Sequence, residues 1–188
     1  MSYAIDAVHE ISESTFRCLA KMNVSVYFAR IWSPANNGEA DKTGVSNIRS
    51  ATNAGLAYGR LPGKGFPLMR VWLQVTSPHA WGANATKNLE FFNDFRSAAA
   101  VKPPLKPFHL CAKNISVGYY TNWYDWSLIM GNAKPFEEYA PLWYWRVNGF
   151  GTRGATAHNI DDFVPFGPFK IPNIKQFVWG RLRIEDEP

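Results

Sequence analysis

The fold class is decided by residues 3–32, YAIDAVHEISESTFRCLAKMNVSVYFARIW. Both ends of this stretch, residues 3–8 and 23–32, are rich in β-branched and aromatic side chains, which is typical of strands. Between them, apolar side chains recur at helical spacing over residues 16–22, after serines that can cap a helix. A strand, a helix and a second strand in this order predict parallel strands joined by a crossover.

The same alternation continues along the chain. It predicts helices over residues 41–53, 86–100 and 122–131, and strands over residues 56–60, 68–75, 115–121, 141–147 and 174–179. A β/α barrel accommodates this alternation in one domain, residues 1–188, with the active site at the carboxyl ends of its strands. The proline-rich residues 102–107 are predicted to form a surface excursion, because proline fits neither a helix interior nor a central strand.

The composition excludes several classes of protein. Hydrophobic residues make up 46% and charged residues 19% of the 188 residues, so the chain is globular rather than disordered. No apolar run approaches the ~18–20 residues of a membrane span, and the first residues contain no charged-then-apolar leader. We therefore expect no membrane partner and no signal peptide in this chain. Three glycosylation sequons, at Asn23, Asn84 and Asn114, slightly favour a secreted ancestor.

The net charge of +5 favours acidic partners such as anionic cell-wall polymer, anionic lipid or nucleic acid. The twenty Lys and Arg residues are scattered singly, however, whereas nucleic-acid-binding proteins concentrate them on one face or arm. We expect no nucleic-acid partner.

No metal or cofactor is expected. The two cysteines, Cys18 and Cys111, form no CxxC motif, and no Cys/His cluster has metal-ligand spacing. The two cysteines could form one disulfide, which the sequence alone leaves open. Residues 149–154 match GxGxxG, but neither the helix nor the later acidic residue of a dinucleotide site follows, so we interpret them as a loop.

Aromatic residues reach 15% of the chain, with eight Trp, and many of them cluster. Aromatic faces suit sugar rings, whose C–H faces are apolar while their edges carry hydroxyl groups. The alternative, that these side chains form the core, stays open for each of them. The candidate sugar-stacking residues are Trp72, Trp81, Tyr120, Trp143 and Trp145.

An ordered set of segments resembles family-25 glycoside hydrolases, the Chalaropsis-type lysozymes, especially their nematode and amoeba-like branch. The segments that carry it are residues 3–6, 14–19, 28–32, 48–55, 71–73, 93–95, 117–121, 126–131, 141–144 and 172–177. The resemblance implies an irregular TIM-like β/α barrel, here shortened between the third and fourth strands, over residues 59–68. It also implies hydrolysis of the β-1,4 bond after N-acetylmuramic acid in bacterial peptidoglycan, a role in defence or digestion, and an extracellular or lysosomal location.

The resemblance also implies where catalytic carboxylates should lie. Asp6 matches the aspartate expected at the end of the first strand. The Asp-x-Glu expected after Val-Trp-Leu is replaced by Gln74 and Thr76, and a further expected aspartate matches Asn148. None of these three replacements can donate an acid proton or carry negative charge, and losing a general acid costs ~10²–10⁴ in rate. We therefore expect a lysozyme-like protein with weak or no hydrolase activity.

Several alternatives remain open. Other acids could substitute for the lost carboxylates, although each is more typical of a solvated or helix-capping acid. Two histidines could also line the cleft. These residues are Glu39, Asp41, Asp125, Asp161 and Asp162, with His9 and His79. The barrel could also serve as a non-catalytic glycan-binding module or as a structural or signalling scaffold, because fold alone does not dictate function.

Overall fold

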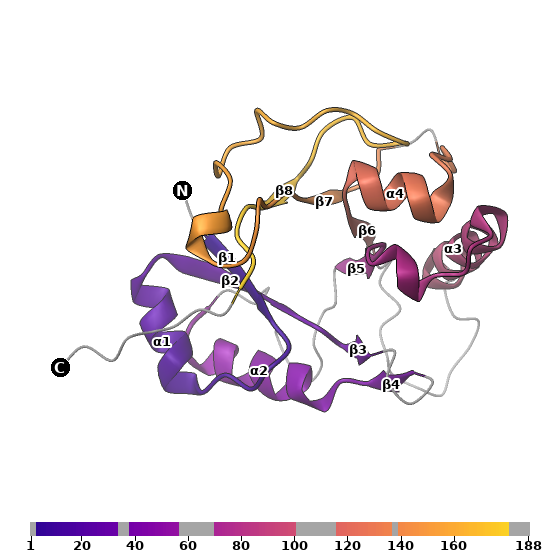
Figure 1. Ribbon diagram of the computed structural model, residues 1–188. Coiled ribbons are helices and arrows are strands. Elements are labelled where there is room, and N and C mark those ends of the chain that lie inside the picture. The colour runs from indigo at the N-terminus through magenta and orange to yellow at the C-terminus, as the bar shows by residue number, and fades with distance from the viewer. Residues whose placement is uncertain (1–2, 34–37, 57–69, 101–115, 137–138, 181–188) are drawn as a thin grey trace, which may run out of the picture. The chain divides into compact units, whose positions relative to one another are not determined.

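The computed structural model describes residues 3–33, 38–56, 70–100, 116–136 and 139–180 (Figure 1). The chain forms two compact units, and the described residues up to 56 belong to the first and those from 70 onward to the second. The described residues contain four α-helices and a parallel sheet of four strands. The predicted α/β class is confirmed. Four predictions lie outside the described residues: all but Leu56 of the strand at 56–60, the shortened connection, the proline-rich excursion and Cys111.

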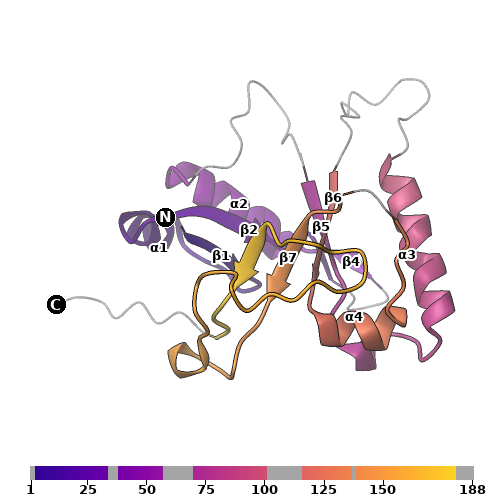
Figure 2. The ribbon, with the colours of Figure 1, turned by 90° about the horizontal axis from the view of Figure 1, so that it is seen from above.

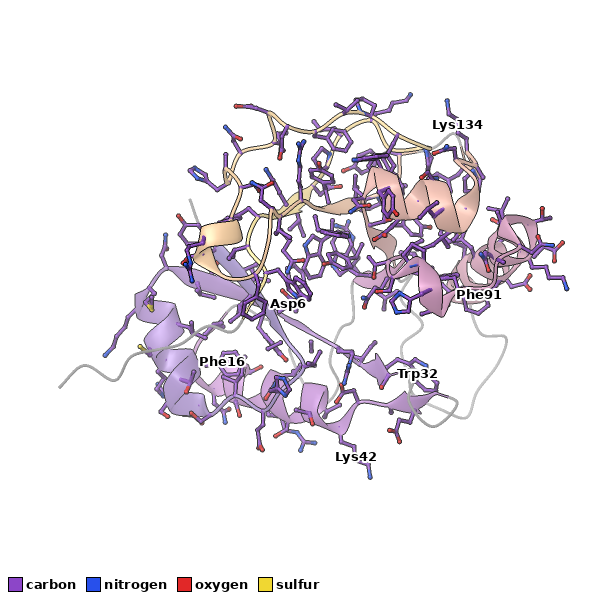
Figure 3. The ribbon with its side chains drawn as sticks, in the orientation of Figure 1. Asp6, Phe16, Trp32, Lys42, Phe91 and Lys134 are labelled. Carbon is purple, nitrogen blue, oxygen red and sulfur yellow. The ribbon has the colours of Figure 1, made fainter. Side chains whose placement is uncertain are left out.

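The first unit begins with a strand–helix–strand repeat, as predicted. Strands β1 (Tyr3–Ala7) and β2 (Val24–Ala29) pair in parallel, and α1 (Glu13–Lys21) connects them. The hydroxyl of Ser12 accepts a hydrogen bond from the Thr15 backbone N–H and caps α1. Phe16 of α1, labelled in Figure 3, packs edge-on against Tyr27 of β2, with ring centroids 5.1 Å apart.

The rest of this unit is a short antiparallel pair, β3 (Trp32–Ser33) and β4 (Glu39–Ala40), followed by α2 (Lys42–Asn53). The buried side chain of Asn47 in α2 accepts from the Ile11 backbone N–H at 2.8 Å and donates to the His9 carbonyl at 2.7 Å and the Tyr27 hydroxyl at 3.0 Å. One amide therefore ties α2 to the loop that follows β1.

The second unit carries four parallel strands in the order in which they occur along the chain. They are β5 (Arg70–Gln74), β6 (Ser116–Thr121), β7 (Leu142–Trp145) and β8 (Ile174–Gln176). Helices α3 (Ala85–Ala100) and α4 (Trp123–Met130) follow β5 and β6, as Figure 2 shows. The predicted helices at 86–100 and 122–131 are confirmed, whereas the strands at 141–147 and 174–179 are shorter than predicted.

The two faces of this sheet differ. Tyr119 and Leu142 point to the face covered by the helices, where they form a core with Phe92 and Trp126. Because successive strand residues point to opposite faces, Trp72, Gln74, Tyr120, Trp143, Trp145 and Gln176 share the other face. The register supports this, since Gln74 pairs with Tyr120, Tyr120 with Trp143, and Trp145 with Gln176. We call these six residues the aromatic face.

Candidate functional site

The carboxyl end of β5 carries an amide and a hydroxyl that bind each other. The Gln74 Nε2 donates to the Thr76 Oγ1 at 2.8 Å, so the two side chains lie on one side of the strand end, as their spacing predicts. Thr76 is buried, whereas Gln74 is exposed. Neither group ionises in the range of glycosidase chemistry.

The aromatic side chains of this face touch one another. The ring centroids of Tyr120 and Trp143 lie 4.7 Å apart, and those of Trp72 and Trp143 lie 5.8 Å apart. Trp143 is buried, while Trp72, Tyr120 and Trp145 are half-buried. The Tyr120 hydroxyl donates to the Gln176 Oε1, so the Gln176 side-chain amide lies beside the aromatic rings. Flat apolar surface beside fixed amide groups is suited to sugar rings.

Gly118 makes room for this arrangement. A Cβ atom at this position of β6 would lie 2.5 Å from the Trp72 ring, which packs directly over the glycine backbone. The Trp72 indole can therefore lie flat across β6 toward Trp143 only because residue 118 has no side chain.

Asp125 follows the carboxyl end of β6 and lies near Ser77, after β5, and Trp145, at the end of β7. It lies in the first turn of α4, where its backbone N–H donates to the capping Asn122 side chain. The residue is 4% exposed, and Oδ2 accepts no hydrogen bond from the part of the chain that the structure describes. Burial raises the pKa of Asp125 to about 6, against the opposing influence of the nearby Trp145 indole and the Ser77 backbone N–H.

The sequence analysis names Asp125 among the acids that could substitute for the lost carboxylates, and favours a solvated or capping role. The structure shows neither role, because the residue is buried and Asn122 is the cap. The available signal was local: Asp125 is the only charged residue in the otherwise apolar helix WYDWSLIM.

The other candidate acids have structural partners. Asp41 caps α2 and pairs with Arg30 at 2.6 Å, and the Arg30 hydrogen bond lowers the pKa of Asp41. Asp161 accepts from Asn159 at 2.6 Å. Asp162 pairs with Lys175 at 2.8 Å, and Glu39 lies exposed on β4.

The remaining predicted site residues are spread over both units. Asp6 lies on β1 of the first unit. The residue as a whole is exposed, but the atoms packed around its carboxyl group desolvate it and raise its pKa. Asn148 lies exposed in the loop after β7, in the second unit. Trp81 packs against the helix-side core rather than the aromatic face, and its indole donates to the Thr76 carbonyl at 3.1 Å. His9 and His79 are both exposed.

Within the described ranges, no three His, Cys, Asp or Glu side chains lie close enough together to hold a metal ion. No helix in these ranges is long and apolar enough to cross a membrane. Residues 149–154, predicted to be a loop, contain a single 3-10 turn, η3 (Thr152–Gly154), and no α-helix. Gly154 packs so closely on Gly149 that a Cβ atom at residue 154 would lie 2.1 Å from the Gly149 carbonyl oxygen.

Comparison with known proteins identifies the family. The family model described as Lysozyme-like protein 1 matches residues 1–60 and 56–177. The chain belongs to this lysozyme-like family. The two matched segments meet at residues 56–60, next to the connection that the sequence predicts to be shortened.

Relatives in two organisms agree with this assignment. Lysozyme-like protein 2 of Caenorhabditis elegans is 36% identical over 200 residues, covering 95% of this chain and 68% of the relative. Lysozyme-like protein 1 of the same nematode is also 36% identical, covering 94% of this chain and 63% of the relative. The probable GH family 25 lysozyme 4 of Dictyostelium discoideum is 26% identical, covering 94% of this chain and 83% of the relative. The resemblance to the nematode and amoeba-like family-25 branch is confirmed. No solved structure matches the chain.

Proposed function

We propose that this lysozyme-like protein binds the peptidoglycan glycan at the carboxyl-end edge of the aromatic face and hydrolyses it weakly or not at all. The observation that carries the proposal is the Gln74–Thr76 hydrogen bond at the end of β5. At the two positions where the family resemblance implies an acid pair, this protein presents a neutral amide bound to a neutral hydroxyl.

Glycoside hydrolysis uses one carboxylic acid to protonate the leaving oxygen and a second carboxylate to attack or to activate water. Gln74 and Thr76 can hydrogen-bond a sugar hydroxyl but cannot take either role. Asp125 does not replace the pair, because it supplies a single carboxyl group and the residue is buried. A site that keeps its stacking surface and loses its acids retains binding and loses turnover.

We also propose that the chain forms an irregular TIM-like β/α barrel. The order β5-β6-β7-β8 supports it, since a doubly wound sheet reverses its strand order at a switch point and a barrel does not. In the first unit, the parallel strands β1 and β2 are joined by a helix, which is the repeating unit of a β/α barrel. An experimental structure in which β8 and β1 hydrogen-bond would support closure, and one with an open sheet would overturn it.

Turbidity clearing of bacterial cell walls tests the catalytic part of the proposal. The natural chain should show little or no clearing. Clearing by the natural chain that Asp6→Asn abolishes would overturn the proposal.

Sedimentation with insoluble peptidoglycan tests the binding part. Trp72→Ala should reduce the retained fraction, while Phe91→Ala, which removes an exposed aromatic ring from α3, should not. If the natural chain is not retained at all, the glycan-binding proposal fails and a scaffold role replaces it. Retention would also fit the proposed extracellular or lysosomal role in defence or digestion, which localisation of the tagged chain tests directly.

A further inference from the structure

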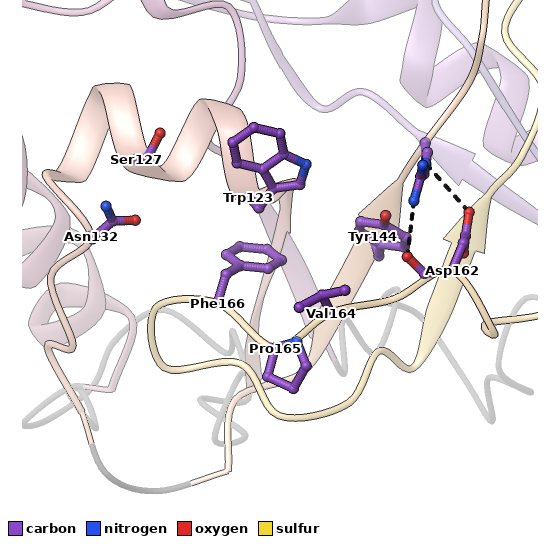
Figure 4. Close-up of a pocket in the computed structure, with 9 residues that line it drawn as sticks. Trp123, Ser127, Asn132, Tyr144, Asp162, Val164, Pro165 and Phe166 are labelled. Carbon is purple, nitrogen blue, oxygen red and sulfur yellow. Dashed lines mark hydrogen bonds and ion pairs between the residues drawn. The ribbon is translucent and has the colours of Figure 1, made fainter.

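A pocket of about 540 Å³ lies beside α4, on the opposite side of the sheet from the aromatic face. It is bordered in part by Trp123, Tyr144 and residues 164–166 (Figure 4). Phe163 packs edge-on against Tyr144, with ring centroids 5.2 Å apart, and Phe169 packs on Trp126 at 5.0 Å. Residues 164 and 165 therefore lie between two aromatic anchors, although they belong to no helix or strand.

The charged groups at this pocket are already paired. The Lys175 Nζ donates to both Asp162 carboxylate oxygens at 2.8 Å. Arg146 stands 3.7 Å from the same carboxylate and donates to the Asp162 backbone carbonyl at 3.0 Å. The pocket therefore presents an apolar wall beside charges that the fold itself uses.

The start of α3, by contrast, presents a polar side chain that is only half used. Asn84 is the N-cap of this helix, because its carbonyl accepts the first helical hydrogen bond from the Asn88 N–H at 3.1 Å. Its Oδ1 accepts from the backbone N–H groups of Thr86 and Lys87, at 3.0 and 3.2 Å. Both lone pairs of this oxygen therefore serve the helix.

The amide nitrogen of the same side chain is not used in this way. Asn84 is exposed, and its Nδ2 donates to no acceptor among the residues that the structure describes. Asn88, one turn later, is the opposite case, because it is buried and its Nδ2 donates to the Gly82 and Ile129 carbonyls. The free nitrogen is thus a property of Asn84 and not of every asparagine on this helix.

Asn84 is also the first residue of the sequon Asn84-Ala-Thr86. The middle residue, Ala85, is half-buried and lies against Gly131 at the end of α4, where an added Cβ atom would lie 3.4 Å from the Ala85 Cβ. Asn84 and Thr86, on either side of it, are exposed. The sequon therefore presents to solvent the two residues that define it.

The sequon at Asn23 has a different setting. Asn23 has a φ of 67° in the turn between α1 and β2, and its Ser25 is half-buried within β2. The sequon at Asn114 lies outside the described residues.

Attachment of a glycan uses the nitrogen of an asparagine and spares its oxygen. A sugar C1 atom replaces one of the two Nδ2 hydrogens, and Oδ1 stays an amide oxygen that can accept both capping bonds. At Asn88 the same change would remove a buried hydrogen bond, which is costly. Asn84 can carry a glycan and keep every hydrogen bond that the structure gives it.

We infer that Asn84 carries an N-linked oligosaccharide. The donor is a lipid-linked oligosaccharide diphosphate. The bond between sugar C1 and the diphosphate oxygen breaks, the bond between C1 and Nδ2 forms, the lipid diphosphate leaves, and the amide proton passes to a base of the transferase. This modification goes beyond the proposed function. It rests on the extracellular or lysosomal location proposed there, because the transfer takes place in the secretory pathway.

The test is mass spectrometry of the full chain, secreted from cultured mammalian cells behind a cleavable leader. Peptide N-glycosidase in heavy-oxygen water converts a glycosylated asparagine to a labelled aspartate. The tryptic peptide 71–87 should carry this label at residue 84. Thr86→Ala should abolish the label and keep the cap, because both capping donors are backbone N–H groups. Asn23→Gln, the matched control, removes a sequon in the first unit and should leave the label at residue 84 unchanged.

Recovery of peptide 71–87 from the secreted chain with Asn84 unmodified would overturn the inference. A label that persists in Thr86→Ala would also overturn it, since spontaneous deamidation would then be its source. The chain produced in bacteria that lack the transferase carries no such glycan. Its retention on peptidoglycan tests the proposed function separately, so the two failures are distinguishable.

Discussion

At the scale of single residues, the burial of Asp125 makes the stability of the fold depend on pH. Its folded-state pKa of about 6 lies above its ordinary value of 3.8. The folded state therefore holds this proton more tightly than the unfolded state. The resulting contribution to stability is fully present below pH 3.8 and is lost as the pH rises through about 6.

Asp125→Asn keeps the shape of the side chain and removes its charge at neutral pH. We expect the free energy of unfolding at pH 7.5 to rise by about 1–3 kcal/mol, and its fall between pH 4 and pH 6 to flatten. Urea unfolding at four pH values measures this. Asp94→Asn, an exposed acid on α3, is the control. A less stable Asp125→Asn at pH 7.5 would mean that the contacts to Ser77 and Trp145 outweigh the cost of burial.

A substitution at Gly118 should change both stability and retention on peptidoglycan. Gly118→Ala places a Cβ atom 2.5 Å from the Trp72 ring, so the ring or the strand must move. Overpacking of this kind costs about 1–3 kcal/mol, and we expect reduced retention on peptidoglycan as Trp72 is displaced. Thermal unfolding and sedimentation measure the two effects. Gly149→Ala, whose Cβ atom would meet nothing closer than 3.8 Å, should change neither.

At the scale of elements, α2 depends on one buried amide. Asn47→Ala would remove the part-buried hydrogen bonds to the Ile11 N–H and the His9 carbonyl and the buried one to the Tyr27 hydroxyl. Because solvent can reach part of this network, we expect a loss of about 1–3 kcal/mol in unfolding free energy. Asn53→Ala, on the exposed end of the same helix, should lose under about 0.5 kcal/mol in the same denaturant series. Similar losses for both variants would contradict the role given to Asn47.

Elements were also what the sequence predicted best. Strand β6 and helix α4 follow from local signals, namely the aromatic run before Asn122, that asparagine as the cap, and Gly131 as the left-handed end. The burial of Asp125 could not be predicted in this way, because it depends on Ser77 and Trp145, which are distant in sequence. The pocket beside Trp123 was missed for the same reason, since its walls come from segments up to about forty residues apart.

At the scale of the whole molecule, the net charge of +5 bears on binding to bacterial walls. Anionic wall polymers attract a basic protein, and salt screens that attraction. We expect retention on intact walls to fall as NaCl rises from about 50 to about 500 mM, while retention on uncharged chitin stays constant. Equal salt sensitivity on both supports would show that the charge of the wall contributes nothing.

The connection between β7 and β8, residues 146–173, is described throughout and contains no α-helix. In a helical crossover, the apolar side chains must recur at helical spacing so that they pack on the sheet. This connection contains no α-helix, so its sequence is free of that requirement. Residues 164 and 165 can therefore be exchanged or extended between the Phe163 and Phe169 anchors without shifting the register of the strands. Substitutions there can change what this surface contacts while the sheet beneath it stays the same.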